Sequence, residues 1–346
     1  MDIFAVSNPD LMKEKLIKAL KYIASAAFAA LLLWFSFRDV QWKDFAASLR
    51  ACRWDFVVLS MAAGSTAFLL RALRWRKLLL PIDSSITVLT TFNAVNIGNV
   101  SNYIFPRIGE LIRCGVITRR SLPEADGSDR KKASYDKVLG TVVLERGWEL
   151  LVMLMLLAVV VVGAFGRYGS FFVEKIWIPM ASGLDFSIWW LVALLILLCG
   201  AALYAVWRYR QTNFLCRKIW TVFHGMVQGF SSCFRMEHKW LFFAYTAFIW
   251  VMYWLMAMST VWAAPFLEGL DVLDALFLSL VGGLGFAVPV PGGIGAFHFV
   301  ISLALSAIYG IPMEQGIVYA TLSHTSQAVT QIFFGLGSYA YESLKK

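Results

Sequence analysis

The chain contains 346 residues, of which 59% are hydrophobic and 15% are charged, and its mean hydropathy is +0.67. A soluble globular protein of this length would have too little polar surface to stay dissolved. The formal charge of +9 comes from Lys and Arg in the connections between apolar runs, which is a positive-inside distribution and does not indicate nucleic-acid binding. We therefore predict an all-α polytopic membrane protein with a single transmembrane domain over residues 1–346.

Six apolar runs are long enough to cross about 30 Å of hydrocarbon as helices. The N-terminal region before the first run is rich in Lys, and no small-residue cleavage site follows before Arg38, so we expect a signal-anchor that is not cleaved. The six runs occupy residues 19–37, 55–73, 141–163, 187–207, 240–263 and 316–340.

A further apolar stretch, 86–117, is flanked on both sides by basic residues. These are the clusters within 71–77 and 118–137, which we expect to be cytoplasmic. If both flanks are inside, the stretch must enter and leave by the same face. We predict a re-entrant hairpin, or two short broken helices, that turns near Asn102–Pro106.

A second stretch, 272–309, has the opposite expected orientation. The connection 208–239 is basic, which predicts a cytoplasmic location. The segment 265–274 contains three acidic residues and neither Lys nor Arg, which predicts an external location. The stretch 272–309 should therefore enter the membrane from the external face and return to it, with its break at Pro289–Gly293.

We also expect an amphipathic helix over 214–234 that lies on the inner face of the membrane.

This topology places both termini in the cytoplasm. It also relates two halves of the chain, 19–163 and 187–340, by inverted topology. Broken backbone is tolerated in hydrocarbon only where protein or water covers it, and paired interruptions in two halves are typical of transporter binding sites. We therefore expect Pro106 and Gly293 to approach each other, with Gly292 and Gly293 as site residues.

The first break also carries charged residues. On a helix, Arg107, Glu110 and Arg113 would lie on one face. Arg can hold a phosphate by two parallel hydrogen bonds, so these residues predict a lipid phosphate site in which Glu110 orients the two arginines. The alternative is an interfacial helix whose charges meet headgroups.

Asparagine recurs every third residue before this break, which forms a slanting polar stripe on a helix. Amides such as those of Asn99 and Asn102 can line a hydrated groove or join helices by hydrogen bonds; both interpretations stay open. The stripe consists of Asn93, Asn96, Asn99 and Asn102.

Charged residues also open the third apolar run. Glu145, Arg146 and Glu149 lie within about one helical turn of each other. Charges at membrane depth are costly unless paired, so Glu149 requires a partner in the protein interior. We expect Arg107 or Arg113.

Two histidines lie in the second half, His298 after the Pro-Gly-Gly break and His324 in an unusually polar last run. Intramembrane histidines can relay protons. A buried histidine can equally be a hydrogen-bonded packing residue, and this alternative stays open.

Three of these motifs together resemble the flippase-like transmembrane region of lysylphosphatidylglycerol synthases. They are Pro106–Arg113, the pair Glu145-Arg146 and Pro289–Gly295, and the similarity runs through nearly the whole chain. The resemblance implies a bacterial or archaeal inner-membrane protein that moves lipids or lipid-linked molecules between leaflets. It also implies a membrane-only member, without the aminoacyl-transferase domain of some relatives. Family members often have an acidic residue at the position of His298.

We therefore expect a flippase-like translocator of a phospholipid, a modified phospholipid or a lipid-linked precursor. The alternatives are a membrane enzyme acting on a lipid phosphate and a non-transporting assembly subunit. We expect no catalytic residue, cofactor or metal, because the five cysteines form no Cys-x-x-Cys pair and no nucleotide-binding loop is present. The expected partner is a membrane lipid, not nucleic acid; a homodimer and a separate lipid-modifying enzyme stay open.

Overall fold

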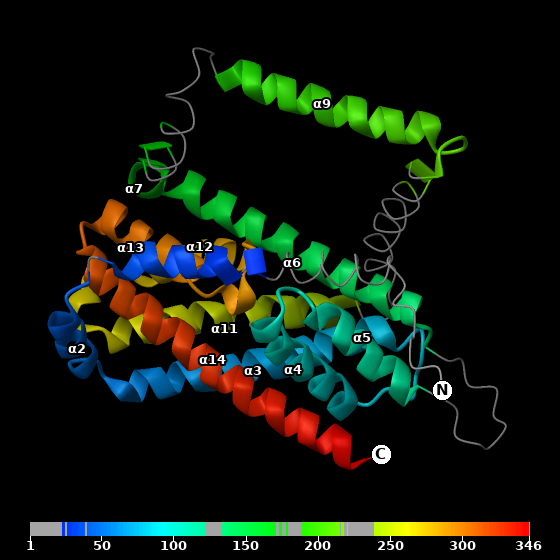
Figure 1. Cartoon of the computed structure of the whole chain (residues 1–346), viewed down its shortest axis with the longest axis horizontal. Helices are drawn as coiled ribbons and strands as arrows, with labels where there is room; N and C mark the ends of the chain where they lie inside the picture. The colour runs from blue at the N-terminus through cyan, green and yellow to red at the C-terminus, as the bar shows by residue number, and fades with distance from the viewer. Residues whose placement is uncertain are drawn as a thin grey trace, which may run out of the picture. The chain divides into compact units, whose positions relative to one another are not determined.

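The protein is described by a computed structural model, and within the described residues its regular structure is entirely helical (Figure 1). The described residues are 23–24, 26–38, 40–121, 133–170, 173–174, 178, 188–214, 216–217, 220 and 239–345. The α-helices are Ala26–Phe37, α2 (Trp42–Arg50), α3 (Trp54–Leu79), α4 (Val88–Ile104), α5 (Gly109–Arg120), α6 (Tyr135–Gly163), α7 (Phe165–Ser170), α9 (Ile188–Tyr209), α11 (Lys239–Ala263), α12 (Val272–Ala287), α13 (Ala296–Tyr309) and α14 (Met313–Leu344), and the short 3₁₀ turns are η2 (Pro265–Leu267) and η3 (Pro291–Gly293).

Four of the described helices are long and apolar enough to cross a membrane: α3, α6, α11 and the segment Pro291–Tyr309 that contains α13. The first three match predicted spans, whereas the fourth lies in the stretch 272–309 that the sequence predicts to be re-entrant. Helices α9 and α14 lie at two other predicted spans but are not among the four. The prediction of an all-α polytopic membrane protein is confirmed, and the count of six full spans stays a prediction.

Several predictions concern residues outside the described part of the chain. They include the start of the first span at 19–22, the centre of the loop 118–137 at 122–132, and most of the proposed amphipathic helix 214–234. The ends of that loop are helical, because α5 runs to Arg120 and α6 starts at Tyr135.

The chain forms two compact units that each combine distant parts of the sequence. The first unit draws on residues 1–68, 92–113 and 251–346, and the second on 69–91 and 114–250. Helices α3, α4, α5 and α11 each contribute residues to both units. This division differs from the predicted halves, whose inverted relation stays a prediction.

The predicted hairpin over 86–117 is present as two helices, α4 and α5, with a break at residues 105–108. Two glycines let the helix backbones touch: a Cβ built on Gly109 would lie 1.9 Å from the carbonyl oxygen of Gly98. Asn102 closes the turn, because its Oδ1 accepts a hydrogen bond of 2.7 Å from the Gly109 backbone N–H. A side chain larger than hydrogen at either glycine would therefore separate the two helices.

We expect Gly109→Ala to lower the stability of the protein by about 1–3 kcal/mol, because the methyl group must displace the backbone of α4. Gly115→Ala is the matched control on the same helix, since a Cβ there meets nothing within 4 Å. This control should be neutral or more stable by about 0.5–1 kcal/mol, because alanine favours the helix. Thermal unfolding of the purified variants in detergent measures both effects, and equal melting temperatures would contradict the close packing.

The second predicted hairpin, over 272–309, consists of α12 and α13 with a break at residues 288–295. Asp271 and Asp274 form a capping box at the start of α12, in which each side chain accepts a hydrogen bond from the other residue's backbone N–H. The Tyr309 hydroxyl at the end of α13 donates to Asp274 Oδ1 at 2.7 Å. This bond joins the open ends of the two helices, so the break lies at the tip of a hairpin.

Other helices of the first unit cover this hairpin. Helix α13 packs against both α12 and α14, and α14 also contacts α2. At the tip, a Cβ on Gly295 would lie 2.8 Å from the carbonyl oxygen of Ala29, so the helix Ala26–Phe37 passes directly over the break. Protein thus covers the break at Gly295, in line with the requirement that broken backbone in the bilayer be covered. The membrane face from which each hairpin enters stays a prediction.

Candidate functional site

The two broken segments meet in the first unit, and we call residues 105–108 and 288–295 with their contacts the hairpin junction. Arg107 Nη2 donates a hydrogen bond of 2.7 Å to the carbonyl oxygen of Ala287, the last residue of α12. The final carbonyls of a helix have no partner within it, and a cationic side chain also interacts favourably with the negative end of the helix dipole. Arg107 therefore caps α12 across the junction, and the predicted approach of the two breaks is confirmed by this contact.

Arg107 does not lie on the helical face that we predicted for it. Helix α5 begins at Gly109, and Arg107 precedes it in the turn with φ of 61°, the one positive φ at a non-glycine residue in the described chain. A non-glycine residue in this left-handed region costs about 1–2 kcal/mol. Strain of this kind persists where surrounding structure enforces it and is concentrated at functional sites. The strain aims an exposed guanidinium at the opposite hairpin.

Glycine is required in the second break for two reasons. Gly292 and Gly293 have φ of 58° and 74°, a conformation that other residues adopt only under strain. In addition, a Cβ on Gly292 would lie 2.4 Å from the ring of Tyr103, which comes from the end of α4. The two predicted glycines thus lie at the junction, Gly292 against the first hairpin and Gly293 against Phe286 of α12.

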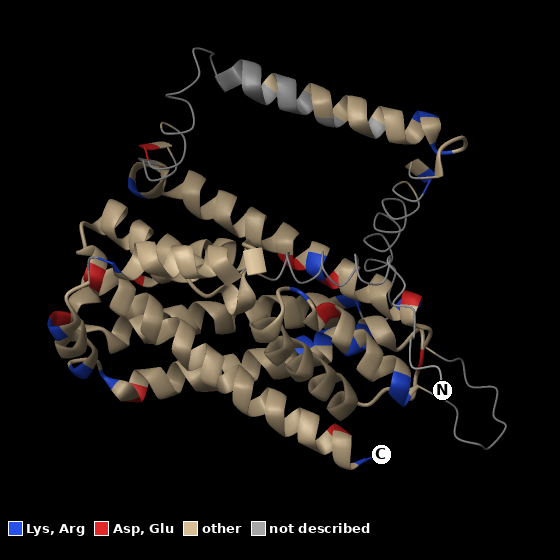
Figure 2. Ribbon diagram, viewed as in Figure 1, with Lys and Arg blue, Asp and Glu red and all other residues tan. Residues whose placement is uncertain are grey.

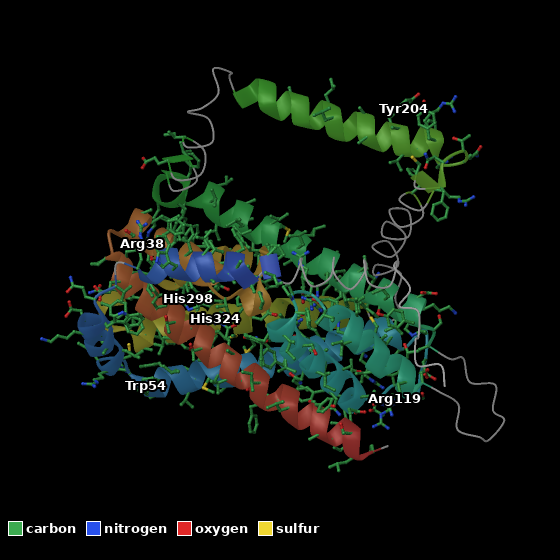
Figure 3. The ribbon with its side chains drawn as sticks, viewed as in Figure 1. Arg38, Trp54, Arg119, Tyr204, His298 and His324 are labelled. Carbon is green, nitrogen blue, oxygen red and sulfur yellow. The ribbon has the colours of Figure 1, made fainter. Side chains whose placement is uncertain are left out.

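The two predicted histidines also meet at the junction (Figure 3). His324 Nε2 lies 2.9 Å from the carbonyl oxygen of Gly292, and the ring centroids of His298 and His324 are 5.1 Å apart. Both residues are buried, with 6% and 5% of their surface exposed. The last long helix, α14, is therefore tied to the broken backbone by a side-chain hydrogen bond.

Among the other predicted residues of the first hairpin, two form hydrogen bonds that hold helices together. Glu110 and Arg113 lie one turn apart on α5; Glu110 is half-buried and Arg113 is buried. Asn102 caps α5, and Asn93 donates to Glu342 Oε1 on α14 at 2.8 Å. These two amides favour the helix-joining interpretation of the stripe. The half-buried Asn99 has an Nδ2 without a hydrogen-bond partner in the described part of the chain.

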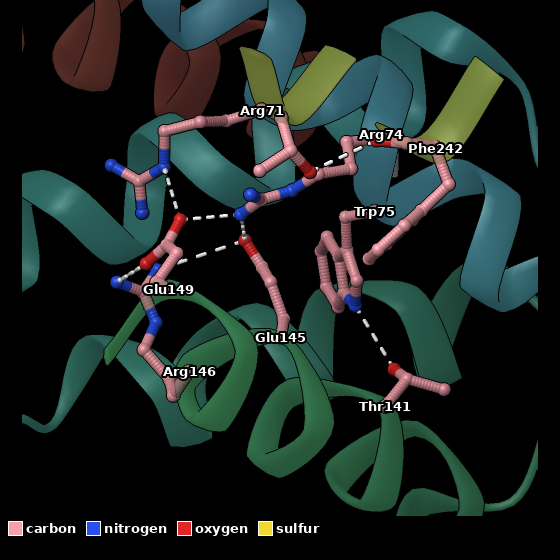
Figure 4. Close-up of polar contacts among 9 residues, drawn as sticks. Arg71, Arg74, Trp75, Thr141, Glu145, Arg146, Glu149 and Phe242 are labelled. Carbon is pink, nitrogen blue, oxygen red and sulfur yellow. Dashed lines mark hydrogen bonds and ion pairs between the residues drawn. The ribbon is translucent and has the colours of Figure 1, made fainter. Parts of the chain in front are cut away.

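The predicted charges on α6 belong to a different group of residues, in the second unit (Figure 4). Figure 2 shows acidic and basic positions part-way along the ribbon of α6. We call Arg71, Arg74, Glu145, Arg146 and Glu149 the arginine–glutamate cluster. Arg74 Nη2 bonds to Glu145 Oε1 at 3.2 Å and also to Glu149, while Arg146 Nη1 donates to Glu149 Oε2 at 2.7 Å. The side chains of Arg74 and Glu145 are both 0% exposed.

This cluster corrects one of our expectations. The partners of Glu149 are Arg71, Arg74 and Arg146, whereas the sequence predicts Arg107 or Arg113. Burial explains the correction, because a carboxylate removed from water requires ion pairs and hydrogen bonds at short range. Arg71 and Arg74, from the basic cluster within 71–77, lie inside α3, and their cytoplasmic side stays a prediction.

Three site residues were not found from the sequence. Arg71 and Arg74 had a usable signal, since two arginines three residues apart at the end of an apolar run can form one face of a buried helix. Tyr103 had none, because an aromatic residue near a membrane interface is ordinary. Its role follows from its contact with Gly292.

Comparison with known proteins supports the resemblance stated from the motifs. A comparison with curated proteins finds no match to this chain. Residues 22–335 match the family described as the lysylphosphatidylglycerol synthase TM region, and this range contains the hairpin junction and the arginine–glutamate cluster. The match covers most of the chain, so the protein belongs to the family of the lysylphosphatidylglycerol synthase transmembrane region.

Proposed function

We propose that this protein translocates an anionic phospholipid, or a lipid-linked molecule with a phosphate, between the leaflets of the membrane. The family links the chain to lipid modification or translocation. The observation that carries the proposal is Arg107, a strained and exposed arginine at the meeting point of two broken-helix hairpins.

The chemistry of Arg107 suits a phosphate. A guanidinium has five N–H donors, and in the described part of the chain Arg107 makes one hydrogen bond, to Ala287. The remaining donors can hold a phosphate by two parallel bonds. Helices α5 and α13 both begin directly after a break, and the positive end of a helix dipole favours an anion. The phosphate would thus pass the hairpin junction while its acyl or prenyl tails stay in lipid.

The test is lipid translocation in vesicles that contain the purified protein. A fluorescent phosphatidylglycerol analogue in the inner leaflet should become accessible to an impermeant quencher faster than in protein-free vesicles. A phosphatidylcholine analogue, whose headgroup has no net charge, serves as the comparison and should move more slowly. Equal rates with and without protein would refute the proposal. Turnover of lipid phosphate with added Mg²⁺ would instead favour a membrane enzyme, and an absence of both activities an assembly subunit.

The proposal includes an inner-membrane location with both termini in the cytoplasm, because Lys and Arg favour that side. In a chain without its native cysteines, Ser128→Cys should react with an impermeant thiol reagent only after the membrane is permeabilised. A cysteine at Glu268, in the acidic segment, should react in intact cells. Reaction at position 128 in intact cells would rule out the proposed orientation.

A further inference from the structure

We propose that the His298–His324 pair binds one proton, and that the bound proton slows lipid transport by holding the break 288–295 in place. The effect on transport rests on the proposed function, whereas proton binding can be measured without it. Imidazole is the side chain whose charge changes in the physiological pH range.

The hydrogen bond of His324 determines which of its nitrogens can take up a proton. A carbonyl oxygen can only accept, so His324 Nε2 carries the hydrogen that is donated to Gly292 at 2.9 Å. The lone pair of the neutral ring is then on Nδ1, which is the atom that accepts a further proton. After protonation the bond to Gly292 becomes charge-assisted, and such bonds are roughly twice as strong as neutral ones.

His298 is a second group able to take up the proton. Its Nδ1 is buried and has no hydrogen-bond partner in the described part of the chain. Burying a polar atom without a partner is unfavourable, and packing alone does not explain a histidine with such an atom. The centroid distance of 5.1 Å brings the two rings close enough that two positive charges would repel strongly. The pair is therefore suited to one proton and not to two.

Burial disfavours a positive charge on either ring, and the aromatic rings around the pair offset part of this cost. The ring of Phe286 stacks on His324 with 5.7 Å between centroids and 16° between planes, and Phe37 lies 5.8 Å from His298. The faces of aromatic rings attract cations. Phe297 from α13 contacts both histidines as well.

No other strongly charged group is recorded against the pair in the described residues. The titratable neighbour from α4 is Tyr103, whose ring centroid is 6.3 Å from that of His324. Arg38, which follows the helix Ala26–Phe37, has its guanidinium over Trp34 and Phe35. Neither the break nor α13 contains an acidic or basic residue other than His298. The charge of the pair is thus determined mainly by the two imidazoles.

The first experiment measures proton binding directly. Protein labelled with ¹³C-histidine and purified in detergent is titrated by NMR, and His298→Gln and His324→Gln assign the signals. We expect a titrating signal that disappears in one variant and shifts its midpoint in the other, because the rings interact. Two independent titrations, or none from either ring, would overturn the proposal.

The second experiment measures lipid translocation in vesicles at about pH 8 and about pH 5, where imidazole changes charge. The readout is the ratio of the two rates for each protein, so variants with different basal rates can be compared. We expect the wild-type rate to fall about fivefold or more in acid, and the rates of His298→Gln and His324→Gln to change less than about twofold. His238→Gln, at a histidine that precedes α11 in the sequence, is the control and should keep the wild-type ratio.

The outcomes separate this inference from the proposed function. Three results would overturn the inference and leave the proposed transport intact. The first two are wild-type rates that are equal at the two pH values, and a wild-type rate that is faster in acid. The third is that both His298→Gln and His324→Gln slow in acid as much as the wild type does. Absence of transport at every pH refutes the proposed function, and the NMR titration then decides whether the pair is a proton site.

Discussion

Arg74→Met should produce the largest loss of stability of any single substitution considered for this protein. Arg74 and Glu145 are both fully buried, and Arg74 also bonds to Glu149. Removing the arginine takes away the partner of Glu145 at 3.2 Å, whereas its ion pair with Arg146 Nη2 is longer, at 3.8 Å. Loss of one partner from a buried pair costs about 3–5 kcal/mol, because the remaining charge is uncompensated. We expect the melting temperature in detergent to fall by about 5 °C or more.

Arg53→Met is the matched control for this prediction. Arg53 also pairs with a carboxylate, Asp55 at 4.0 Å, but the two side chains are 59% and 68% exposed. Exposed pairs contribute little, so this variant should melt close to the wild type. The double substitution Arg74→Met with Glu145→Leu should recover part of the loss, since apolar residues of similar size can replace a buried pair. If Arg74→Met and Arg53→Met had the same melting temperature, the arginine–glutamate cluster would not stabilise the fold.

Arg107→Lys should lower transport by about tenfold, a large effect for a substitution that conserves the charge. Lysine keeps the charge and the same backbone strain, but it lacks the planar pair of donors that holds a phosphate at two points. The difference between the two proteins therefore isolates the geometry of the guanidinium. The measurement is translocation of the anionic lipid analogue at matched protein amounts. Wild-type transport by Arg107→Lys would mean that this arginine does not hold the headgroup.

Arg107→Gly separates a transport role from a structural one. Glycine adopts the φ of 61° without strain, which should offset much of the loss of the hydrogen bond to Ala287, worth about 0.5–1.5 kcal/mol. We therefore expect a melting temperature near that of the wild type together with a loss of transport. Arg50→Lys, in the last turn of α2, is the control for a conservative arginine substitution and should leave both quantities unchanged. Loss of folding in Arg107→Gly would show that the contact with Ala287 is mainly structural.

The sequence alone determined the fold class and the positions of the two breaks. Hydropathy and the distribution of Lys and Arg are local properties, and they predicted helices, connections and two Pro- and Gly-containing interruptions. The breaks lie at 105–108 and 288–295, where Pro106, Pro289 and Pro291 interrupt helical hydrogen bonding. The close approach of the breaks could also be predicted, because the bilayer does not tolerate uncovered broken backbone.

Only the tertiary structure decided which polar residues pair with each other. The hydrogen bonds of Arg74 join residues 71 and 75 positions apart in the sequence, and no local pattern specifies such a pairing. The same holds for Arg107: its helical spacing to Glu110 predicted a shared face, but the turn between α4 and α5 places it before α5 with a positive φ. Local periodicity predicts what a residue does within its own helix. The partner of a buried charge depends on which distant helix covers it, because the cost of removing a charge from water is offset only by an opposite charge at short range.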